Sequence, residues 1–454
     1  MEYRRRIADD ILREKLQVFG AVLITGPKGC GKTTTAKQQS ASFIEFQDED
    51  RREQYLSVAR TMPSKLLEGE RPRLFDEWQD APKIWGAIRK SVDDLQIPGQ
   101  YILTGSTSKN ADTAHTGTLR ISRMSMYPMS LYESGESNGT VSLSELFEDP
   151  EGFEGCRSEL DVDGIIHAIC RGGWPYSLTQ DDPGRSLLIA KDLFRQTCEV
   201  DISNVDDKKR SPMLTRLLLR SYSRNICQLA DNRTIIADVN ANAAFSESSY
   251  YDYVQALEKL HLISDVEAWC PAIRSKTAIR SGRKRNLADP SIAVAALGVG
   301  PKYFNTDFKT LGFLFESLCM RDLTVYLSRS GGHVSYYHDR YGLEADAVLH
   351  MEDGRYAICE IKLGQDEIDE GAKHLVEMER LIQQYNEDEK QMPLELPSLK
   401  IVITGTEYGY RRDDGVLVIP IACLRDRRAR ARYRATPGSV GDGWGLAPPA
   451  PEND

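Results

Sequence analysis

The chain has 454 residues, which at about 150 residues per domain predicts roughly three domains, each long enough to bury its own core. It carries 58 Lys and Arg against 68 Asp and Glu, a net charge of −10, which argues against a uniform coat for nucleic acid but not against local basic patches. The 9 cysteines include no CxxC pair, so neither a zinc knuckle nor a disulfide framework is indicated. No run reaches the ~18 apolar residues of a membrane helix. We therefore expect a cytoplasmic protein with reduced cysteines and no membrane partner.

The first part of the chain alternates apolar runs with helix-compatible segments, which is typical of a parallel α/β sheet. A buried strand is expected at 21–25, directly before a glycine-rich segment. Further apolar runs at 74–75 and 101–103 end in Asp76-Glu77 and in Thr104-Gly105-Ser106. The sequence therefore predicts an α/β domain over roughly the first 135 residues.

The glycine-rich segment fits a phosphate-binding loop. Residues 26–33, GPKGCGKT, match GxxxxGK[ST] and precede a helix-compatible stretch at 34–40. In this pattern backbone N–H groups surround phosphate oxygens, the lysine bridges the β- and γ-phosphates, and the threonine holds Mg²⁺. No NKxD-like guanine reader is present, which favours ATP over GTP. The residues predicted to bind the nucleotide are Gly26, Pro27, Lys28, Gly29, Cys30, Gly31, Lys32, Thr33 and Thr34.

Two carboxylates and a hydroxyl are expected beside this loop. Asp76 is predicted to hold Mg²⁺ together with Thr33, and Glu77 is predicted to polarise the attacking water. Ser106 would place a hydroxyl near the γ-phosphate. Lys32 and Glu77 are therefore the predicted catalytic residues, and Glu77 favours a hydrolase over a switch or a kinase.

These motifs resemble those of the AAA-type P-loop ATPases of bacteria and archaea whose carboxy-terminal half carries a domain of unknown function. The resemblance rests on GPKGCGKT, on LFDEWQ, on YILTGSTS and on GGWP, and it spans residues 15–425. It implies that Ser106 senses the γ-phosphate. It also implies that Arg120 is the nucleotide-contacting arginine that follows a glycine in family members, although Leu119 stands here where that glycine usually does. Whether Arg120 or Arg123 acts as an arginine finger, in cis or across subunits, is left open.

A second charged group lies on the predicted strands at 345–350 and 356–361, and further strands are expected at 400–404 and 416–420. A two-residue turn between the first two would send Asp346 and Glu360 to opposite faces of the sheet. A three-residue turn with Gly354 left-handed would pair 346 with 360 and place both carboxylates, with Lys362, on one face.

Two carboxylates and a lysine gathered in this way can bind Mg²⁺, activate water and stabilise a phosphodiester under attack. The pattern D-x13-ExK, preceded by Glu316 on a helix expected at 312–326, resembles the PD-(D/E)XK nuclease-like fold. The resemblance implies that Glu316, Asp346 and Glu360 hold metal and that Asp346, Glu360 and Lys362 are catalytic. The alternatives are a solvated ion pair between Glu360 and Lys362 at a strand edge, or an intact fold without activity.

Two stretches of the chain are locally basic. Residues 274–285 hold six basic residues and no acidic one, and they resemble the wing of a winged helix behind a helix expected at 250–260. A second, arginine-rich cluster spans 425–434. Either stretch can contact the phosphates of nucleic acid, and either can instead be a solvated surface.

The predicted fold class is α/β, with an AAA-type P-loop NTPase parallel sheet, a helical and winged-helix-like middle, and a carboxy-terminal α/β domain resembling PD-(D/E)XK nucleases. The expected boundaries are 1–135 for the ATPase core, 136–235 for a helical lid region, 236–300 for the winged-helix-like segment, 301–430 for the nuclease-like domain and 431–454 for a disordered tail.

The predicted function is Mg²⁺-dependent ATP binding and hydrolysis, coupled to a nuclease-like, nucleic-acid-binding carboxy-terminal domain. One alternative is an ATP-driven switch whose terminal domain is a catalytically silent interaction module, and another is a regulatory ATPase that binds DNA. ATP and Mg²⁺ are the expected ligands and DNA or another nucleic acid is a candidate partner. Assembly into a homo-oligomer is left open.

Overall fold

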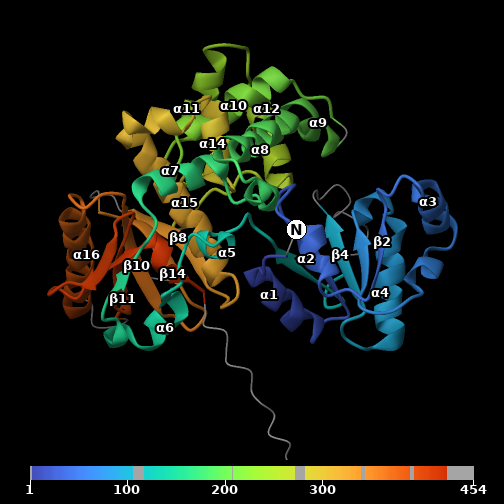
Figure 1. Ribbon diagram of the computed structural model, residues 1–454, viewed down its shortest axis with the longest axis horizontal. Coiled ribbons are helices and arrows are strands. Elements are labelled where there is room, and N and C mark those ends of the chain that lie inside the picture. Colours follow the sequence, from blue (N-terminus) through green and yellow to red (C-terminus); the bar gives the residue numbers. More distant parts are fainter. Residues whose placement is uncertain are drawn as a thin grey trace, which may run out of the picture.

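The computed structural model describes residues 3–105, 117–206, 208–270, 282–338, 343–388 and 393–426. Figure 1 shows three lobes: an amino-terminal α/β lobe in blue, a carboxy-terminal α/β lobe in orange and red, and a group of green and yellow helices above and between them. Within the described residues, no helix combines the length and the apolarity that crossing a membrane requires.

The amino-terminal lobe is built on a five-stranded parallel sheet with the order β2-β3-β4-β1-β5. Its strands are β1 (Ala21–Thr25), β2 (Ser42–Glu45), β3 (Arg73–Asp76), β4 (Tyr101–Gly105) and β5 (Ile121–Ser125), and its helices are α1 (Ile7–Leu16), α2 (Lys32–Lys37), α3 (Arg52–Thr61) and α4 (Lys83–Leu95). The two central strands are buried almost completely, because apolar clusters cover both faces of the sheet. The predicted parallel α/β sheet is confirmed.

The middle of the chain is helical and begins its helices with local capping signals. Its elements are α7 (Val162–Arg171), α8 (Pro183–Gln196), α9 (Ile202–Asn204), α10 (Pro212–Arg224), α11 (Asn232–Asn240), α12 (Glu247–Lys259) and α14 (Pro290–Leu297). Asp182, Ser211 and Asp289 each cap a helix whose first residue is proline, a combination that fixes the helix start. Residues 263–270 and 282–287 then form the two arms of an antiparallel hairpin, through the bridges Ile263–Leu287 and Val266–Lys284.

The carboxy-terminal lobe contains a seven-stranded mixed sheet with the order β7-β12-β13-β11-β10-β9-β8. Its elements are α15 (Phe308–Leu327), β8 (His333–His338), β9 (Glu344–His350), β10 (Tyr356–Lys362), α16 (Ile368–Asp388), β11 (Leu399–Thr404), β12 (Tyr408–Arg411) and β13 (Leu417–Pro420), with β7 (Cys156–Arg157) at one edge. The predicted strands and the helix expected at 312–326 are confirmed within a few residues. In this sheet the start of β9 and the end of β10 lie side by side, and α15 packs against both strands.

The segment expected to begin a helical lid at residue 136 instead belongs in part to the carboxy-terminal lobe. β6 (Val141–Ser142) pairs with β14 (Leu424–Arg425), and β7 pairs with β12. Two short helices, α5 (Leu131–Ser134) and α6 (Leu143–Glu148), flank β6. Before it forms the helical middle, the chain therefore adds an edge strand to the carboxy-terminal sheet and forms a separate two-stranded sheet with β14. The partners of β7 and β6 lie about 250 and about 280 positions later in the chain.

Buried ion pairs join the lobes around α15. Arg321 binds Asp289 at 2.8 Å and Asp322 at 2.7 Å, and all three side chains are almost fully buried. Asp322 also accepts a hydrogen bond of 2.9 Å from the backbone of Leu131. At the end of α15, Arg329 binds Asp10 and Glu14 of α1. The helix therefore contacts the helical middle, the amino-terminal lobe and its own sheet.

Candidate functional sites: a phosphate-binding loop and an acidic centre

The glycine-rich loop lies at the carboxyl end of β1 and runs into α2. Gly26 has a φ of 151°, and a Cβ atom there would lie 2.1 Å from the backbone oxygen of Met126, so only glycine fits. Gly29 and Gly31 also adopt left-handed conformations, with φ of 81° and 101°. The backbone of the loop therefore has the shape that the sequence pattern predicts.

Lys32 and Thr33 occupy the positions expected of a nucleotide site. The buried Lys32 Nζ donates to the backbone oxygens of Gly26 and Pro27, both at 3.0 Å. Thr33 Oγ1 donates to Asp76 Oδ1 at 2.7 Å, and Thr104 also donates to this carboxylate. A hydroxyl and a carboxylate in contact are the ligand types that Mg²⁺ prefers beside nucleotide phosphates, so these residues fit the expected metal.

Glu77 follows Asp76 directly and has a left-handed backbone, with a φ of 53°. Non-glycine residues seldom adopt this conformation, and such strain concentrates at functional sites. Gln79 donates a side-chain hydrogen bond to the Glu77 carboxylate. Glu77 lines the same cavity as Lys32 and Thr33, so the structure brings together the predicted catalytic and magnesium-binding residues.

This cavity measures about 760 Å³, which is within the range of small-molecule sites. Part of its wall comes from residues that the motif analysis did not identify, in the amino-terminal segment, α2 and the turn after Trp174. They are Tyr3, Arg4, Arg6, Thr35, Gln38, Pro175, Tyr176, Leu178 and Thr179, together with Met129 from the segment after β5. The sequence signals for this wall were the GGWP motif, which contains Pro175, and the stretch Tyr127-Pro128-Met129-Ser130-Leu131, which contains Met129.

Two residues predicted to bind the nucleotide point their side chains elsewhere. Lys28 binds Asp201 of the helical middle at 3.2 Å, and Cys30 is fully buried with its Sγ 3.7 Å from the backbone oxygen of Met126. Arg6 donates to the backbone oxygens of Cys30 and Tyr127, at 2.9 and 2.8 Å, and so ties the loop to the chain after β5. Cys30 therefore contributes only backbone to the loop, whereas Lys28 binds Asp201 and still lines the cavity.

The two remaining nucleotide-site predictions have different outcomes. Ser106 lies outside the described residues. Arg120 lies at the amino end of β5, beside Ala21, whereas the loop follows Thr25 at the carboxyl end of β1. Five strand residues separate the two ends, about 16 Å at 3.3 Å per residue, and Arg120 binds the exposed Asp93 at 2.8 Å. The expectation that Arg120 binds the nucleotide of its own chain is therefore wrong.

The β9–β10 hairpin has the register that places Asp346 and Glu360 together. His350 pairs with Tyr356 and Ala347 with Cys359, so Asp346 comes opposite Glu360. Met351 N donates to Arg355 O at 2.9 Å, which leaves three residues in the turn, and Gly354 is left-handed with a φ of 92°. Of the two turns left open by the sequence, the structure has the three-residue one.

The four residues of the nuclease-like pattern converge. Lys362 Nζ lies 2.7 Å from Glu360 Oε2 and 3.5 Å from Asp346 Oδ2, and Asp346 also accepts from Ile361 N at 2.8 Å. Glu316 of α15 faces the same group. We call Glu316, Glu344, Asp346, Glu360, Lys284 and Lys362 the acidic centre. Because Glu360 is almost fully buried, the alternative of a solvated ion pair with Lys362 at the strand edge is excluded.

Lys284, on the second arm of the hairpin (residues 282–287), lies inside the acidic centre. Its Nζ is 2.7 Å from Glu344 Oε1, 3.1 Å from Glu316 Oε1 and 3.6 Å from Asp346 Oδ1, and its side chain is 3% exposed. Within the part of the chain that the structure describes, no three His, Cys, Asp or Glu residues are arranged to hold a metal ion. As arranged here, the centre therefore does not fit the predicted metal. The Lys284 ammonium lies between Glu316 and Asp346, where a metal ion bound by both carboxylates would lie.

The charges of the acidic centre are strongly coupled. Burial raises the pKa of Glu316 to about 8 despite Lys284, and burial together with Asp346 raises the pKa of Glu360 to about 8 despite Lys362. Burial opposes the charge of Lys284, but Glu316, Asp346 and Glu344 outweigh it and raise the pKa of that ammonium. Four carboxylates surround two lysines, so a change in the protonation of one group alters the pKa of its neighbours.

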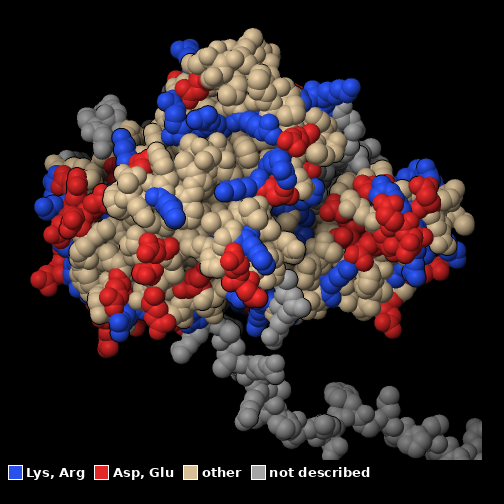
Figure 2. Space-filling view, turned by 45° about the horizontal axis from the view of Figure 1, so that its top comes forward, with Lys and Arg blue, Asp and Glu red and all other residues tan. Residues whose placement is uncertain are grey.

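Most of the basic stretch 274–285 lies outside the described residues, as do the arginines after residue 426. Three basic residues of this stretch are described, and of these Arg283 is exposed and paired with Glu267. Lys284 and Arg285 are buried, and Arg285 binds Asp265 at 2.8 Å. These two residues therefore cannot contact the phosphates of nucleic acid. Figure 2 shows acidic and basic side chains on the drawn face, with many acidic ones over the amino-terminal lobe at the right.

Family models match three separate parts of the chain. Residues 19–135 match an AAA domain, residues 163–303 a domain of unknown function (DUF8612), and residues 311–424 another domain of unknown function (DUF4143). Lys284 comes from the second part, and Glu316, Glu344, Asp346, Glu360 and Lys362 come from the third. The acidic centre therefore joins two domains.

Searches of solved structures find only distant similarity. A Walker-type ATPase of Pyrococcus abyssi is 15% identical, with 63% of this chain and 94% of that chain covered and a TM-score of 0.37. A RuvB variant of Thermotoga maritima is also 15% identical, with coverages of 57% and 86% and a TM-score of 0.27. A DNA replication initiation factor is 12% identical, with coverages of 57% and 89% and a TM-score of 0.20. No curated protein matches.

The AAA-domain match covers the parallel sheet, the glycine-rich loop, Asp76 and Glu77. The match and the geometry agree on the same residues, and neither depends on the distant structural similarities. Residues 19–135 of this chain therefore match the model of an AAA domain and have the geometry of a P-loop nucleotide site.

Proposed function

We propose that this protein binds ATP at the P-loop and hydrolyses it with the help of Mg²⁺. The observation that carries the proposal is the contact between Thr33 and Asp76, with Glu77 beside it in a cavity large enough for a nucleotide. A protein that only switches between nucleotide-bound states needs Thr33 and Asp76 to hold Mg²⁺. Hydrolysis also needs a group that accepts a proton from water, which is the role of Glu77.

Each residue of the site has a distinct role in this proposal. Lys32 exchanges its two backbone oxygens for phosphate oxygens when the nucleotide binds, so its charge is available at little cost. Thr33 and Asp76 would hold Mg²⁺, which neutralises phosphate charge. Glu77, oriented by Gln79, accepts the proton of the attacking water. Cytoplasmic location and assembly into a homo-oligomer remain predictions.

Replacement of Glu77 by Gln tests the proposal. The variant should bind ATP with unchanged affinity, since the amide keeps the shape of the carboxylate, and should lose turnover by about 10²–10⁴-fold. Binding is measured with a fluorescent ATP analogue and turnover by phosphate release. Glu53→Gln on α3, an exposed residue of the same lobe, is the control. Wild-type turnover in Glu77→Gln would remove Glu77 from this role.

A second candidate function is Mg²⁺-dependent cleavage of nucleic acid at the acidic centre. The convergence of Glu316, Asp346, Glu360 and Lys362 favours it, and the presence of Lys284 among them opposes it. Incubation of plasmid and single-stranded DNA with the protein and Mg²⁺ is the direct test, with Asp346→Asn as the inactive control. No cleavage together with intact ATPase activity would support a catalytically silent interaction module instead.

A further inference from the structure

The hairpin formed by residues 263–270 and 282–287 is fixed on the carboxy-terminal sheet by main-chain contacts. Tyr336 of the edge strand β8 donates its N–H to Glu267 O at 3.1 Å, and Trp269 N donates to Tyr336 O at 2.7 Å. The other arm contributes Gly282, whose backbone oxygen accepts from the Tyr336 hydroxyl. Trp269 also packs on Tyr356 of β10, with ring centroids 4.5 Å apart. Both arms of the hairpin therefore hold the edge of the sheet that contains the acidic centre.

Lys284 is delivered into the acidic centre by a rigid backbone. Lys284 and Val266 exchange two main-chain hydrogen bonds, at 2.9 and 3.0 Å, directly beside the docked segment. The side chain then passes the ring of Tyr336, with Nζ 5.6 Å from the ring centroid, and ends among the three carboxylates. A lysine on a flexible surface segment lacks such contacts. The backbone pairing and the Tyr336 ring therefore hold this ammonium in a defined position.

An ammonium in this position competes directly with a divalent cation. Lys284 Nζ contacts one oxygen of Glu316 and one of Asp346, which a bridging metal ion would also need at about 2.0–2.6 Å. Two cations cannot share these oxygens at such distances, because their repulsion in a buried site is large. Without the Lys284 ammonium, the predicted metal ligands Glu316, Asp346 and Glu360 would be left with Lys362 and with His374, which lies 3.6 Å from Glu360. Such an arrangement attracts a divalent cation.

We propose that Lys284 is the resident cation of the acidic centre, and that it keeps divalent metal out as long as the hairpin is docked on β8. The inference rests on the second candidate function, since it concerns the regulation of that centre. It explains why a complete set of nuclease-like residues shows no metal-binding arrangement. Metal enters when the hairpin carries Lys284 out of the centre.

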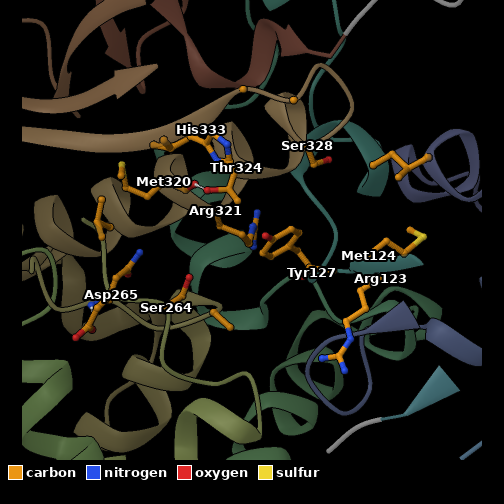
Figure 3. Close-up of a pocket in the computed structure, with 18 of the residues that line it drawn as sticks. Arg123, Met124, Tyr127, Ser264, Asp265, Met320, Arg321, Thr324, Ser328 and His333 are labelled. Atoms are coloured by element: carbon orange, nitrogen blue, oxygen red, sulfur yellow. Dashed lines mark hydrogen bonds between the residues drawn. The ribbon is translucent and has the colours of Figure 1, made fainter. Parts of the chain in front are cut away.

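A cavity borders the base of the hairpin. It measures about 460 Å³ and lies where the amino-terminal sheet, the hairpin and α15 meet. Figure 3 shows Arg123 and Met124 of β5 on one side of it, Ser264 and Asp265 of the hairpin below, and Met320, Arg321 and Thr324 of α15 beside them. The base of the hairpin and the helix that carries Glu316 therefore adjoin the same space as the edge strand of the ATPase sheet.

Binding of Mn²⁺ to the full-length protein without nucleotide tests the proposal, because no activity is required for the readout. In Lys284→Met the centre should bind one Mn²⁺ at least about tenfold more tightly than in the wild type, as measured by electron paramagnetic resonance titration. The additional Asp346→Asn change should abolish this binding. Arg283→Met, which removes the exposed neighbouring charge, should behave as the wild type.

Glu344→Gln gives a test that does not depend on the folding of Lys284→Met. Glu344 is the nearest partner of Lys284, and its side chain is 39% exposed, so the variant should fold. Removing it weakens the hold on Lys284 and should tighten Mn²⁺ binding, whereas loss of a metal ligand would weaken that binding. Tighter binding in Glu344→Gln supports the proposal, and weaker binding overturns it.

The remaining outcomes separate this proposal from the function on which it rests. Equally tight, Asp346-dependent Mn²⁺ binding in the wild type and in Lys284→Met would overturn the role of Lys284 and leave a metal-dependent centre. No Asp346-dependent binding in any variant would overturn both the role of Lys284 and metal-dependent cleavage. Neither outcome bears on ATP hydrolysis at the P-loop.

Discussion

The P-loop and the acidic centre contain similar charged groups, but their lysines have different partners and different exposure. Each combines lysine with carboxylates, but Lys32 rests on two neutral backbone oxygens, whereas Lys284 rests on three carboxylates. The P-loop lines an accessible cavity, while the two lysines of the acidic centre are 3% and 23% exposed. The first lysine is therefore available to a ligand, and Lys284 is used by the protein itself.

This difference shows that the same residue types do not imply the same readiness to bind. A lysine on neutral partners exchanges them for phosphate at small cost, because no buried charge is left behind. A lysine on buried carboxylates cannot leave without exposing uncompensated charge. The partners of a lysine, more than the motif in which it occurs, decide whether it binds a ligand or stabilises the fold.

The largest expected effect is the loss of stability in Lys284→Met. Removing this ammonium leaves Glu316 buried without its cation and Asp346 with Lys362 alone, which should lower the free energy of unfolding by about 3–5 kcal/mol in a metal-free buffer. Urea denaturation in the presence of a chelator measures it. Arg283→Met provides the control, and a loss below about 1 kcal/mol would mean that the acidic centre does not depend on Lys284.

The matching change in the P-loop should have the reverse profile. Lys32→Met removes two hydrogen bonds to neutral oxygens, so the free energy of unfolding should change by only about 1 kcal/mol. ATP affinity should fall by about 100-fold, since a charged contact to phosphate is lost. Calorimetric titration measures the affinity, and Lys37→Met in the same helix, where Lys37 binds Glu45 at 2.7 Å, is the control. A large decrease in the free energy of unfolding of Lys32→Met would show that Lys32, like Lys284, stabilises the fold, and would contradict the difference proposed between the two sites.

The sequence predicted the P-loop almost completely because its chemistry is local. A strand, a glycine-rich turn and Lys32-Thr33 follow one another in the chain, and Asp76 is identified by the end of a neighbouring strand. Arg120 was placed wrongly, because a motif gives residue order but not the end of the strand at which a residue lies. In the parallel register with β1, Arg120 comes before the first pair, at the end of the sheet opposite the loop.

The acidic centre was predictable only in part. Gly354 allowed the correct turn, but the sequence could not choose it over a two-residue turn, since both suit the same residues. Lys284 could not be found at all, because it belongs to a basic stretch that has the pattern of an exposed surface. Only the docking of the hairpin on β8 brings this lysine to Glu316 and Glu344. Similarly, β6 and β7 are too short to show a strand period.

The free energy of unfolding should depend on pH through His261, a partly buried histidine whose pKa is affected by Lys32 of the P-loop. Burial, with a smaller contribution from Lys32, lowers the pKa of His261 to about 4 from an ordinary 6.5. The folded protein therefore holds this imidazole neutral, so its contribution to stability is complete above pH 6.5 and is lost as the pH falls toward 4. Between pH 7 and pH 5 the loss should be about 1–2 kcal/mol.

His261→Asn should remove this part of the pH dependence. Asparagine tolerates the left-handed backbone of the position, where φ is 57°, and does not titrate. Thermal unfolding at pH 5 and pH 7 measures the change against the wild type. His338→Asn, at an exposed position on the end of β8, should leave the pH dependence as it is. An identical pH dependence in His261→Asn would show that the folded and unfolded states protonate this residue equally.

The smallest effect is expected for Arg120→Ala. Arg120 and Asp93 are both nearly half exposed, so their ion pair should contribute no more than about 1 kcal/mol to stability. Since Arg120 lies at the end of the sheet away from the loop, ATP affinity should change by less than about twofold. Lys90→Ala, which breaks the exposed pair with Asp94 on the same helix as Asp93, is the matched control. Phosphate release completes the test. A large loss of turnover with unchanged ATP affinity would contradict a purely local role, because an arginine so far from its own nucleotide can act only on the nucleotide of a second copy of this chain.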